Sequence, residues 1–172
     1  MDALECILTR RSIKGFSDKP VSDEDLSLII EAARRAPSGM NRQTWNFTVL
    51  KRKESISELA AAIAKKLDRK NYDFYKPVIL ILVSNERESP FADVDCACAL
   101  ENIFLAAHAL GIGSVWINQL KGICDDPEIR KVLDGFGLPK DHVVTGMAAL
   151  GYCGDYTVKP KVLAENTVRI IE

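Results

Sequence analysis

An unbroken apolar run, Pro77-Val78-Ile79-Leu80-Ile81-Leu82-Val83, constrains the fold of this chain more than any other segment. The run has the length of a strand and offers no polar position on either face. A strand with one face in water alternates polar and apolar residues, whereas a continuous apolar run must be covered on both sides. The sequence therefore predicts a layered protein in which this run is a central strand buried by helices above and below.

The rest of the chain reads as helices and strands in mixed order. Periodicity and capping residues predict helices over 2–9, from the Ser22 cap to before Pro37, and over 54–69, 92–110 and 127–133. Strands are predicted over 45–51, 77–83, 114–117 and 143–150, and strand character returns over 168–171. No linker or repeat divides the 172 residues. We expect one α+β domain over residues 1–172 with four or five strands.

Composition excludes several classes of function. The formal net charge is -1, so no global positive field points to nucleic acid or to an anionic membrane. No apolar run approaches the roughly 20 residues that span a bilayer, and the first residues do not resemble a signal peptide. We therefore expect a cytoplasmic protein. The five cysteines are scattered and the chain has only two histidines, so neither a disulfide framework nor a metal site is predicted.

A cluster of cations and hydroxyls follows the first predicted helix. It contains Arg10, Arg11, Ser12 and Lys14. Guanidinium and ammonium groups beside hydroxyls suit a phosphate monoester, because charge-assisted hydrogen bonds to an anion are strong. The alternative is that these cations only complement the negative carboxyl-terminal end of the helix. The residues alone leave both interpretations open.

A second polar cluster follows the second predicted helix. It contains Pro37, Ser38, Asn41 and Gln43 and leads into Trp45. An amide-rich turn that ends in an aromatic residue suits a flat heterocycle with polar edges, although a simple polar turn is the alternative. The helix between the clusters has the length to fold the second back towards the first. Together the clusters suggest a phosphorylated aromatic cofactor.

Ordered motifs along the chain resemble one known family. They are R-R-S-I-K-G-F at 10–16, A-P-S-G-M-N-R-Q-T-W-N-F at 36–47, D-C-A-C-A-L-E-N-I-F-L-A-A-H-A-L-G-I-G-S-V-W-I-N-Q at 95–119, L-G-Y at 150–152 and K-P-K at 159–161. This pattern is similar to that of the flavin-dependent nitroreductase family. The resemblance implies a three-layer α+β fold with a central, mostly antiparallel sheet flanked by helices. It also implies non-covalent FMN as cofactor, NAD(P)H as electron donor and a homodimer with flavin sites at the subunit interface.

The resemblance assigns each cluster a part of the flavin site. The first cluster would bind the FMN phosphate, the ribityl chain and one pyrimidine edge, with Lys14 near N1 and O2. The second would close the site, partly from the other subunit. Two later segments complete the implied site: Trp116, Ile117 and Asn118 would lie against the isoalloxazine with a backbone N–H facing N5, and Lys159 and Lys161 would return to the phosphate.

The implied activity is hydride transfer from NAD(P)H through FMN to a small electron acceptor by a ping-pong cycle. The acceptor would be a nitroaromatic, a quinone or an enone. Because the cofactor carries the redox chemistry, no catalytic dyad is needed. Two alternatives stay open: a protein that stores, senses or delivers flavin without fast NAD(P)H turnover, and a dehalogenase or ring-remodelling enzyme with a dedicated lid.

Several features depart from the family pattern. Thr44 stands where proline is common, and Lys161 replaces an arginine, which keeps the charge but loses bidentate geometry. The short chain leaves little room for a helical insertion over the substrate, so an open pocket is expected. Tyr72, Phe74 and Tyr75 are candidates for its lining, with a structural role as the alternative.

The nearly uncharged helix over 92–110 must be wrapped either by the chain's own core or by a partner. Its alanines would permit close helix approach, and Leu100, Ile103, Phe104 and Leu110 would supply interface area. In the other alternative, the helix is simply buried in the core of its own chain.

Overall fold

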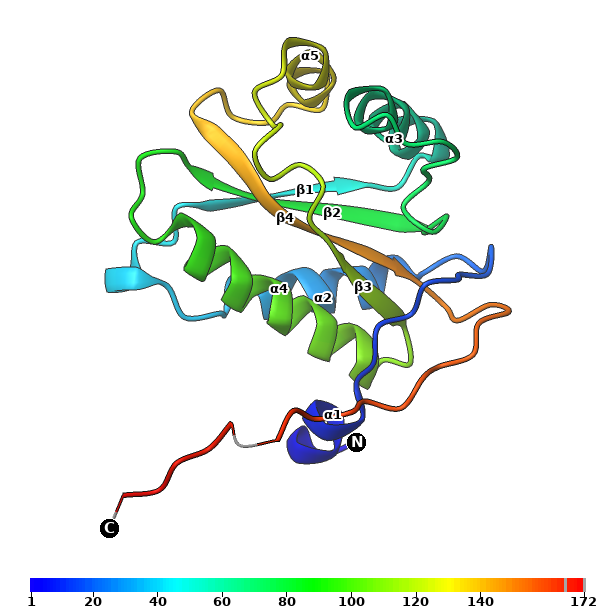
Figure 1. Ribbon diagram of the computed structural model, residues 1–172, viewed down its shortest axis with the longest axis vertical. Helices are drawn as coiled ribbons and strands as arrows, with labels where there is room; N and C mark the ends of the chain where they lie inside the picture. The colour runs from blue at the N-terminus through cyan, green and yellow to red at the C-terminus, as the bar shows by residue number, and fades with distance from the viewer. Residues whose placement is uncertain (166, 172) are drawn as a thin grey trace.

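The computed structural model describes residues 1–165 and 167–171, and it has three layers (Figure 1). A four-stranded sheet lies in the middle in the order β1-β2-β4-β3, and every neighbouring pair is antiparallel. The strands are β1 (Trp45–Leu50), β2 (Ile79–Glu86), β3 (Gly113–Ile117) and β4 (His142–Gly151). The predicted α+β class and the antiparallel sheet are confirmed.

The helices lie on both sides of this sheet. They are α1 (Ala3–Thr9), α2 (Asp23–Arg34), α3 (Lys53–Lys66), α4 (Ala92–Ala109) and α5 (Pro127–Gly135), with a short 3-10 turn η1 at Gly39–Asn41. Figure 1 shows α2 and α4 against one face and α3 and α5 against the other. Ser22 caps α2 by accepting the Asp25 N–H, as the sequence predicts.

The apolar side chains of strand β2 explain why helices cover both faces of the sheet. Residues 79–85 are all buried, and alternate side chains enter two different cores. Leu80 and Leu82 pack with α3 and α5, while Ile81 and Val83 pack with α2 and α4. The apolar run is therefore a central strand buried on both faces, as predicted, although the strand continues through Glu86.

Two sequence expectations about exposed and buried segments differ from the structure. The tail over 168–171 forms no strand, and its apolar side chains are exposed, because it pairs with none of the four strands of the sheet. In α4, Leu100, Ile103 and Phe104 pack into the chain's own core, so these residues cannot supply a dimer interface. Among the described residues, no helix has the length and apolar character needed to cross a membrane.

Candidate functional site

The segment that carries the first cation cluster lies along the free edge of β3. The Ile13 N–H donates to the Ser114 carbonyl at 2.9 Å, and Ser12 and Ser114 form a parallel bridge. Ile13 is buried, whereas the flanking Ser12 and Lys14 are exposed. Because side chains alternate in an extended segment, these two polar groups point outward on the same side.

Gly113 makes this close approach possible. A Cβ atom built on Gly113 would stand 2.9 Å from Ile13 Cγ1 and 3.0 Å from the Gly151 carbonyl oxygen. Real Cβ atoms almost never come so close to other heavy atoms, so a side chain here would push residues 12–14 away from the sheet. The position of the cation cluster against β3 therefore depends on this glycine.

The cations of the cluster have different roles in the structure. The Arg11 guanidinium donates to the carbonyls of Leu8 and Arg10, at 2.9 and 2.7 Å, and so caps the end of α1. Arg10 instead lies over the Phe104 ring, 6.0 Å from its centroid, and 3.8 Å from a carboxylate oxygen of Glu101. The helix-end interpretation thus fits Arg11, and the anion-binding interpretation fits Arg10.

Neighbouring groups set the charge around Arg10. Burial, followed by the positive charges of Arg10 and Arg11, lowers the pKa of His108, so this imidazole is neutral at pH 7. His108 Nε2 lies 2.9 Å from Thr9 Oγ1. The positive charge at this surface therefore comes from the arginines and from Lys14, whose ammonium lies 5.7 Å from the Tyr75 ring centroid.

Trp116 presents an aromatic surface next to Arg10. Its side chain is 43% exposed, and its ring stands 5.9 Å from the Phe104 ring that supports Arg10. Strand β3 pairs with a strand only on its β4 side, so main-chain groups of its other edge are open beyond the contact with Ile13. Ile117 is buried, and the Asn118 N–H is taken by the Gln119 side chain at 3.1 Å.

The second polar cluster lies elsewhere in the same chain. Gly39 donates its N–H to Asp95 at 2.8 Å, and a Cβ on Gly39 would overlap the Phe91 ring. The cluster therefore sits at the amino-terminal end of α4, whereas Arg10 contacts Phe104. Asp95 and Phe104 are separated by about 14 Å along the helix axis, at about 1.5 Å per residue. The prediction that α2 folds the second cluster back onto the first is wrong within a single chain.

The turn over 38–43 is itself well held. The Gln43 N–H donates to Ser38 Oγ at 3.2 Å, and the Gln43 side chain donates to Asn41 at 2.8 Å. Pro37, Asn41 and Gln43 are exposed and Ser38 is half-buried. Asp95 is buried, and its second carboxylate oxygen has no hydrogen-bond partner among the described residues. The cluster is thus an ordered, mostly exposed polar surface.

The late lysines are not joined to the other candidate residues. Lys159 and Lys161 are exposed in a segment without regular structure, and neither forms an ion pair or hydrogen bond within the described residues. The chain just before them is tied down, because the Gly154 N–H donates to Gly15 and the Ser17 N–H to Tyr152. The structure therefore brings the start of this segment beside the first cluster, but not the lysines.

Sequence reasoning missed the residues that support the site. Phe104 joins Arg10 to Trp116, and Asp95 anchors the second cluster, yet both lie in a helix that reads as plain core. A carboxylate in the first turn of an otherwise apolar helix was the available sequence signal for Asp95. Of the three aromatics before β2, Phe74 is buried, Tyr72 is partly buried and Tyr75 is exposed beside Lys14.

The first cluster and Trp116 together can bind a flat ring that carries an anionic group. Arg10, Ser12 and Lys14 supply donors and positive charge, Trp116 supplies aromatic surface, and the open β3 edge supplies main-chain groups. No group of three or more metal-ligating side chains lies together among residues 1–165 and 167–171.

Comparison with known proteins identifies the family to which the chain belongs. A nitroreductase from Bacteroides fragilis, solved with bound FMN, superposes with a TM-score of 0.94 at 41% identity, and the match covers 100% of both chains. An FMN-bound nitroreductase from Desulfitobacterium hafniense gives 0.88 at 29% identity, again over 100% of both chains. An FMN reductase [NAD(P)H] from Bacillus subtilis is 29% identical over 97% of this chain and 72% of its own. The Nitroreductase family model matches residues 7–152, and the chain belongs to this family.

Proposed function

We propose that this protein is an FMN-dependent oxidoreductase that takes hydride from NAD(P)H and passes it to a small electron acceptor. The observation that carries the proposal is the joint surface of Arg10, Ser12 and Trp116 on the free edge of β3. FMN bound to the structural relatives and NAD(P)H in the name of the Bacillus subtilis reductase support the choice of cofactor and donor.

Each residue of the first cluster would have a different role in binding FMN. Arg10 and Ser12 would bind the phosphate and ribityl oxygens. Arg11 would stabilise the carboxyl-terminal end of α1, which comes directly before the cluster. Lys14 would place its ammonium where negative charge accumulates on the ring, which favours electron uptake. FMN, when bound, supplies the chemistry that accepts and donates hydride.

We also propose that a second copy of the chain completes the site. Pro37, Ser38, Asn41 and Gln43 are ordered but lie far along α4 from Arg10, so they serve a flavin only if they act on the site of another subunit. Exposed apolar side chains on α1 and α4 support such contact: Leu4, Ile7, Leu8 and Val94. Lys159 and Lys161 are proposed to reach the phosphate in this assembly.

Strand β3 would provide the ring face. Trp116 would lie against the isoalloxazine; Ile117 is buried and fixes the strand in the core, and Asn118 follows the end of the strand. We propose a ping-pong order, in which the oxidised nicotinamide leaves before a nitroaromatic, quinone or enone enters at the same face. A flavin-storage or sensing role is the second candidate.

Anaerobic mixing of the FMN-loaded protein with NADH or NADPH tests the proposal. The visible flavin absorbance should fall within the time of a turnover and return when menadione is added. Absence of any fall with both donors would overturn the oxidoreductase proposal and favour storage. In parallel, Arg10→Ala should weaken FMN binding by about tenfold, since a hydrogen bond to a charged group contributes about 1.5–3 kcal/mol. Lys140→Gln, an exposed lysine beyond the opposite end of the sheet, is the matched control.

Subunit exchange tests the shared site. Arg10→Ala and Asn41→Ala should each weaken FMN binding when pure. If one chain supplies Arg10 and its partner Asn41, mixing the two variants creates dimers with one intact site and one doubly altered site. Part of the tight FMN binding should then return. A mixture that exchanges subunits but binds no better than either variant would contradict the shared site, while leaving the oxidoreductase proposal intact.

A further inference from the structure

The turn over 38–44 contains three residues in an unfavourable backbone conformation. Met40, Asn41 and Gln43 have φ values of 55, 55 and 52°, a region that residues other than glycine seldom adopt. Such conformations persist only where the surrounding structure enforces them, and they are concentrated at ligand sites. The contacts that enforce this conformation are therefore candidates for a functional role.

Asp95 holds the start of the turn. It is only 3% exposed, and its Oδ1 accepts the Gly39 N–H at 2.8 Å, while its Oδ2 has no hydrogen-bond partner among the described residues. The Phe91 ring packs on the same glycine, since a Cβ on Gly39 would stand 2.4 Å from two ring atoms. Burying a carboxylate with few bonds is costly, although the positive end of α4 offsets part of that cost. The bond to Gly39 is what this costly group provides.

Asn85 holds the end of the turn. This residue of β2 is fully buried, and its Oδ1 accepts the Thr44 hydroxyl at 2.7 Å and the Glu86 N–H at 2.8 Å. Asn85 also pairs with Trp45 across β1 and β2, so this anchor lies where the turn enters the sheet. Thr44 is the position at which proline is common in the family. A proline would restrict its own φ, whereas Thr44 is tied to a buried strand by its side chain.

We infer that Asp95 and Asn85 are positioning residues of the candidate flavin site. They fix the two ends of the turn, so that Ser38, Asn41 and Gln43 keep one arrangement before the flavin binds. Both side chains are buried and act through the turn rather than on the flavin. The inference rests on the proposed function, in which this turn acts on the flavin of another copy. A turn that is already ordered loses little conformational entropy on binding, so loss of an anchor should lower the affinity for FMN.

Three variants test the two anchors by titration of FMN. Asp95→Ala removes the acceptor of the Gly39 N–H and should weaken FMN binding by about fivefold or more. Asp95→Asn keeps an acceptor oxygen at the same place and should recover most of this affinity. Thr44→Val removes the hydroxyl that Asn85 accepts but keeps the shape of the side chain, and it should weaken FMN binding by about threefold. Thermal melting shows whether each variant is folded.

Subunit exchange separates positioning from a general loss of structure. If Asp95 acts through the turn on the partner's flavin, a mixture of Asp95→Ala with Arg10→Ala forms dimers that have one intact site. Part of the tight FMN binding should then return. A mixture of Asp95→Ala with Asn41→Ala should recover nothing, because both changes lie in the same half of the site. If Asp95→Ala does not fold, Thr44→Val takes its place in both mixtures.

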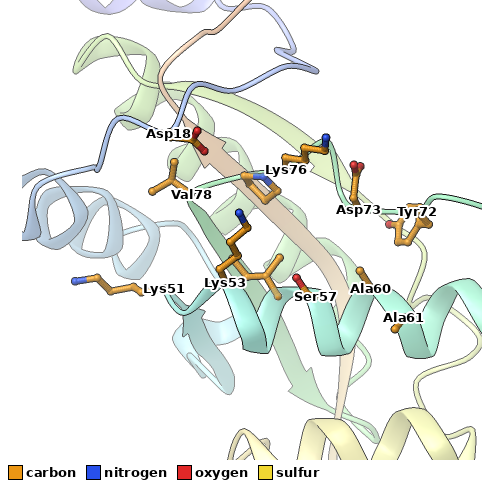
Figure 2. A pocket seen from close by; sticks show the side chains of 12 residues that line it. Asp18, Lys51, Lys53, Ser57, Ala60, Ala61, Tyr72, Asp73, Lys76 and Val78 are labelled. Atoms are coloured by element: carbon orange, nitrogen blue, oxygen red, sulfur yellow. The ribbon is translucent and has the colours of Figure 1, made fainter.

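A cavity beyond the other end of β1 supplies the matched control. It measures about 490 Å³ and lies between α3 and the segment over 72–78, where Ser57 lines it and no residue of the turn does (Figure 2). Ser57→Ala removes a hydroxyl, as Thr44→Val does, and should bind FMN as tightly as the unaltered protein.

Two kinds of result would overturn the inference. One is that Asp95→Ala and Thr44→Val bind FMN as tightly as the unaltered protein, or that Asp95→Asn loses as much affinity as Asp95→Ala. The other is that subunits exchange but Arg10→Ala with Asp95→Ala recovers no binding. If Arg10→Ala with Asn41→Ala recovers binding in the same experiment, the shared site stands and only the role of Asp95 is wrong. The oxidoreductase proposal is tested separately, by the fall in flavin absorbance with NADH or NADPH.

Discussion

Gly113→Ala directly perturbs the contact that holds residues 12–14 of the candidate flavin site against β3. The new methyl group would meet Ile13 Cγ1 at 2.9 Å and the Gly151 carbonyl oxygen at 3.0 Å. The carbonyl belongs to β4 and cannot move away, because Gly151 pairs with Gly113 across the sheet. Relief must therefore come from Ile13, and movement of Ile13 carries Ser12 and Lys14 away from the edge of β3.

The size of the effect follows from two opposing contributions. Forcing an extra methyl into a packed site costs about 1–3 kcal/mol, while replacing glycine by alanine gains about 0.4–1 kcal/mol from the unfolded chain. The backbone at Gly113 lies outside the positive-φ region, so no further strain is added. The net loss should be about 0–2.6 kcal/mol, with a midpoint of about 1.3 kcal/mol, which for a chain of this size lowers the Tm by about 3–5 °C.

Gly135→Ala is the matched control. Gly135 ends α5, has no atom within 4 Å of a built Cβ and has no positive φ, so alanine should be neutral or stabilise by up to about 1 kcal/mol. Both variants are melted at one protein concentration, since self-association shifts the Tm. FMN titration should show a loss of about tenfold for Gly113→Ala alone, the equivalent of one hydrogen bond to a charged group. If the Gly113→Ala protein matches the unaltered one in both Tm and FMN affinity, residues 12–14 do not pack against β3 as described.

Two further predictions concern stability away from the flavin site. Tyr72→Phe should raise the free energy of unfolding by about 1 kcal/mol and the Tm by about 2–4 °C, because it removes a buried hydroxyl that has no described partner. A loss of similar size would show that the hydroxyl is satisfied. Hydrogen bonds from Arg87, at 2.6 and 2.8 Å, lower the pKa of Asp125 below its ordinary 3.8. The stability from this pair is complete above pH 3.8 and is lost as the pH falls through the lower, folded-state pKa. The difference in unfolding free energy between Asp125→Asn and the unaltered protein, measured by urea melts, should therefore shrink on acidification below pH 3.8, and a constant difference would contradict the linkage.

The layered fold could be predicted because the apolar pattern of β2 has few solutions. A run with no polar position admits one environment, a strand covered on both faces, and helices were available before and after it. Local signals such as the Ser22 cap also agree with the structure, since they depend only on neighbouring residues. The apolar pattern and the helix cap are local features, so they can be identified directly in the sequence.

Contacts between distant segments could not be predicted in the same way. The second polar cluster follows α2, but its position is set by Asp95 and Phe91 on α4, more than fifty residues later. The sequence left open whether α4 is covered by its own core or by a partner, because nearly every position is apolar and periodicity does not distinguish the face toward the core from the exposed one. Residues 168–171 have strand-like composition, yet a strand requires a partner edge that composition cannot supply.

The two halves of the candidate flavin site are built differently, and this difference bears on assembly. Arg10 and Trp116 are joined through Phe104, whose ring is buried, so their arrangement comes with the folded chain. The turn over 38–43 is equally well fixed, but on the opposite end of α4, and no motion of a side chain can bring it to Arg10. A flavin that contacted both would therefore have to lie between two copies. Cofactor affinity should then depend on protein concentration, because each binding event would stabilise the pair of chains as well as the flavin.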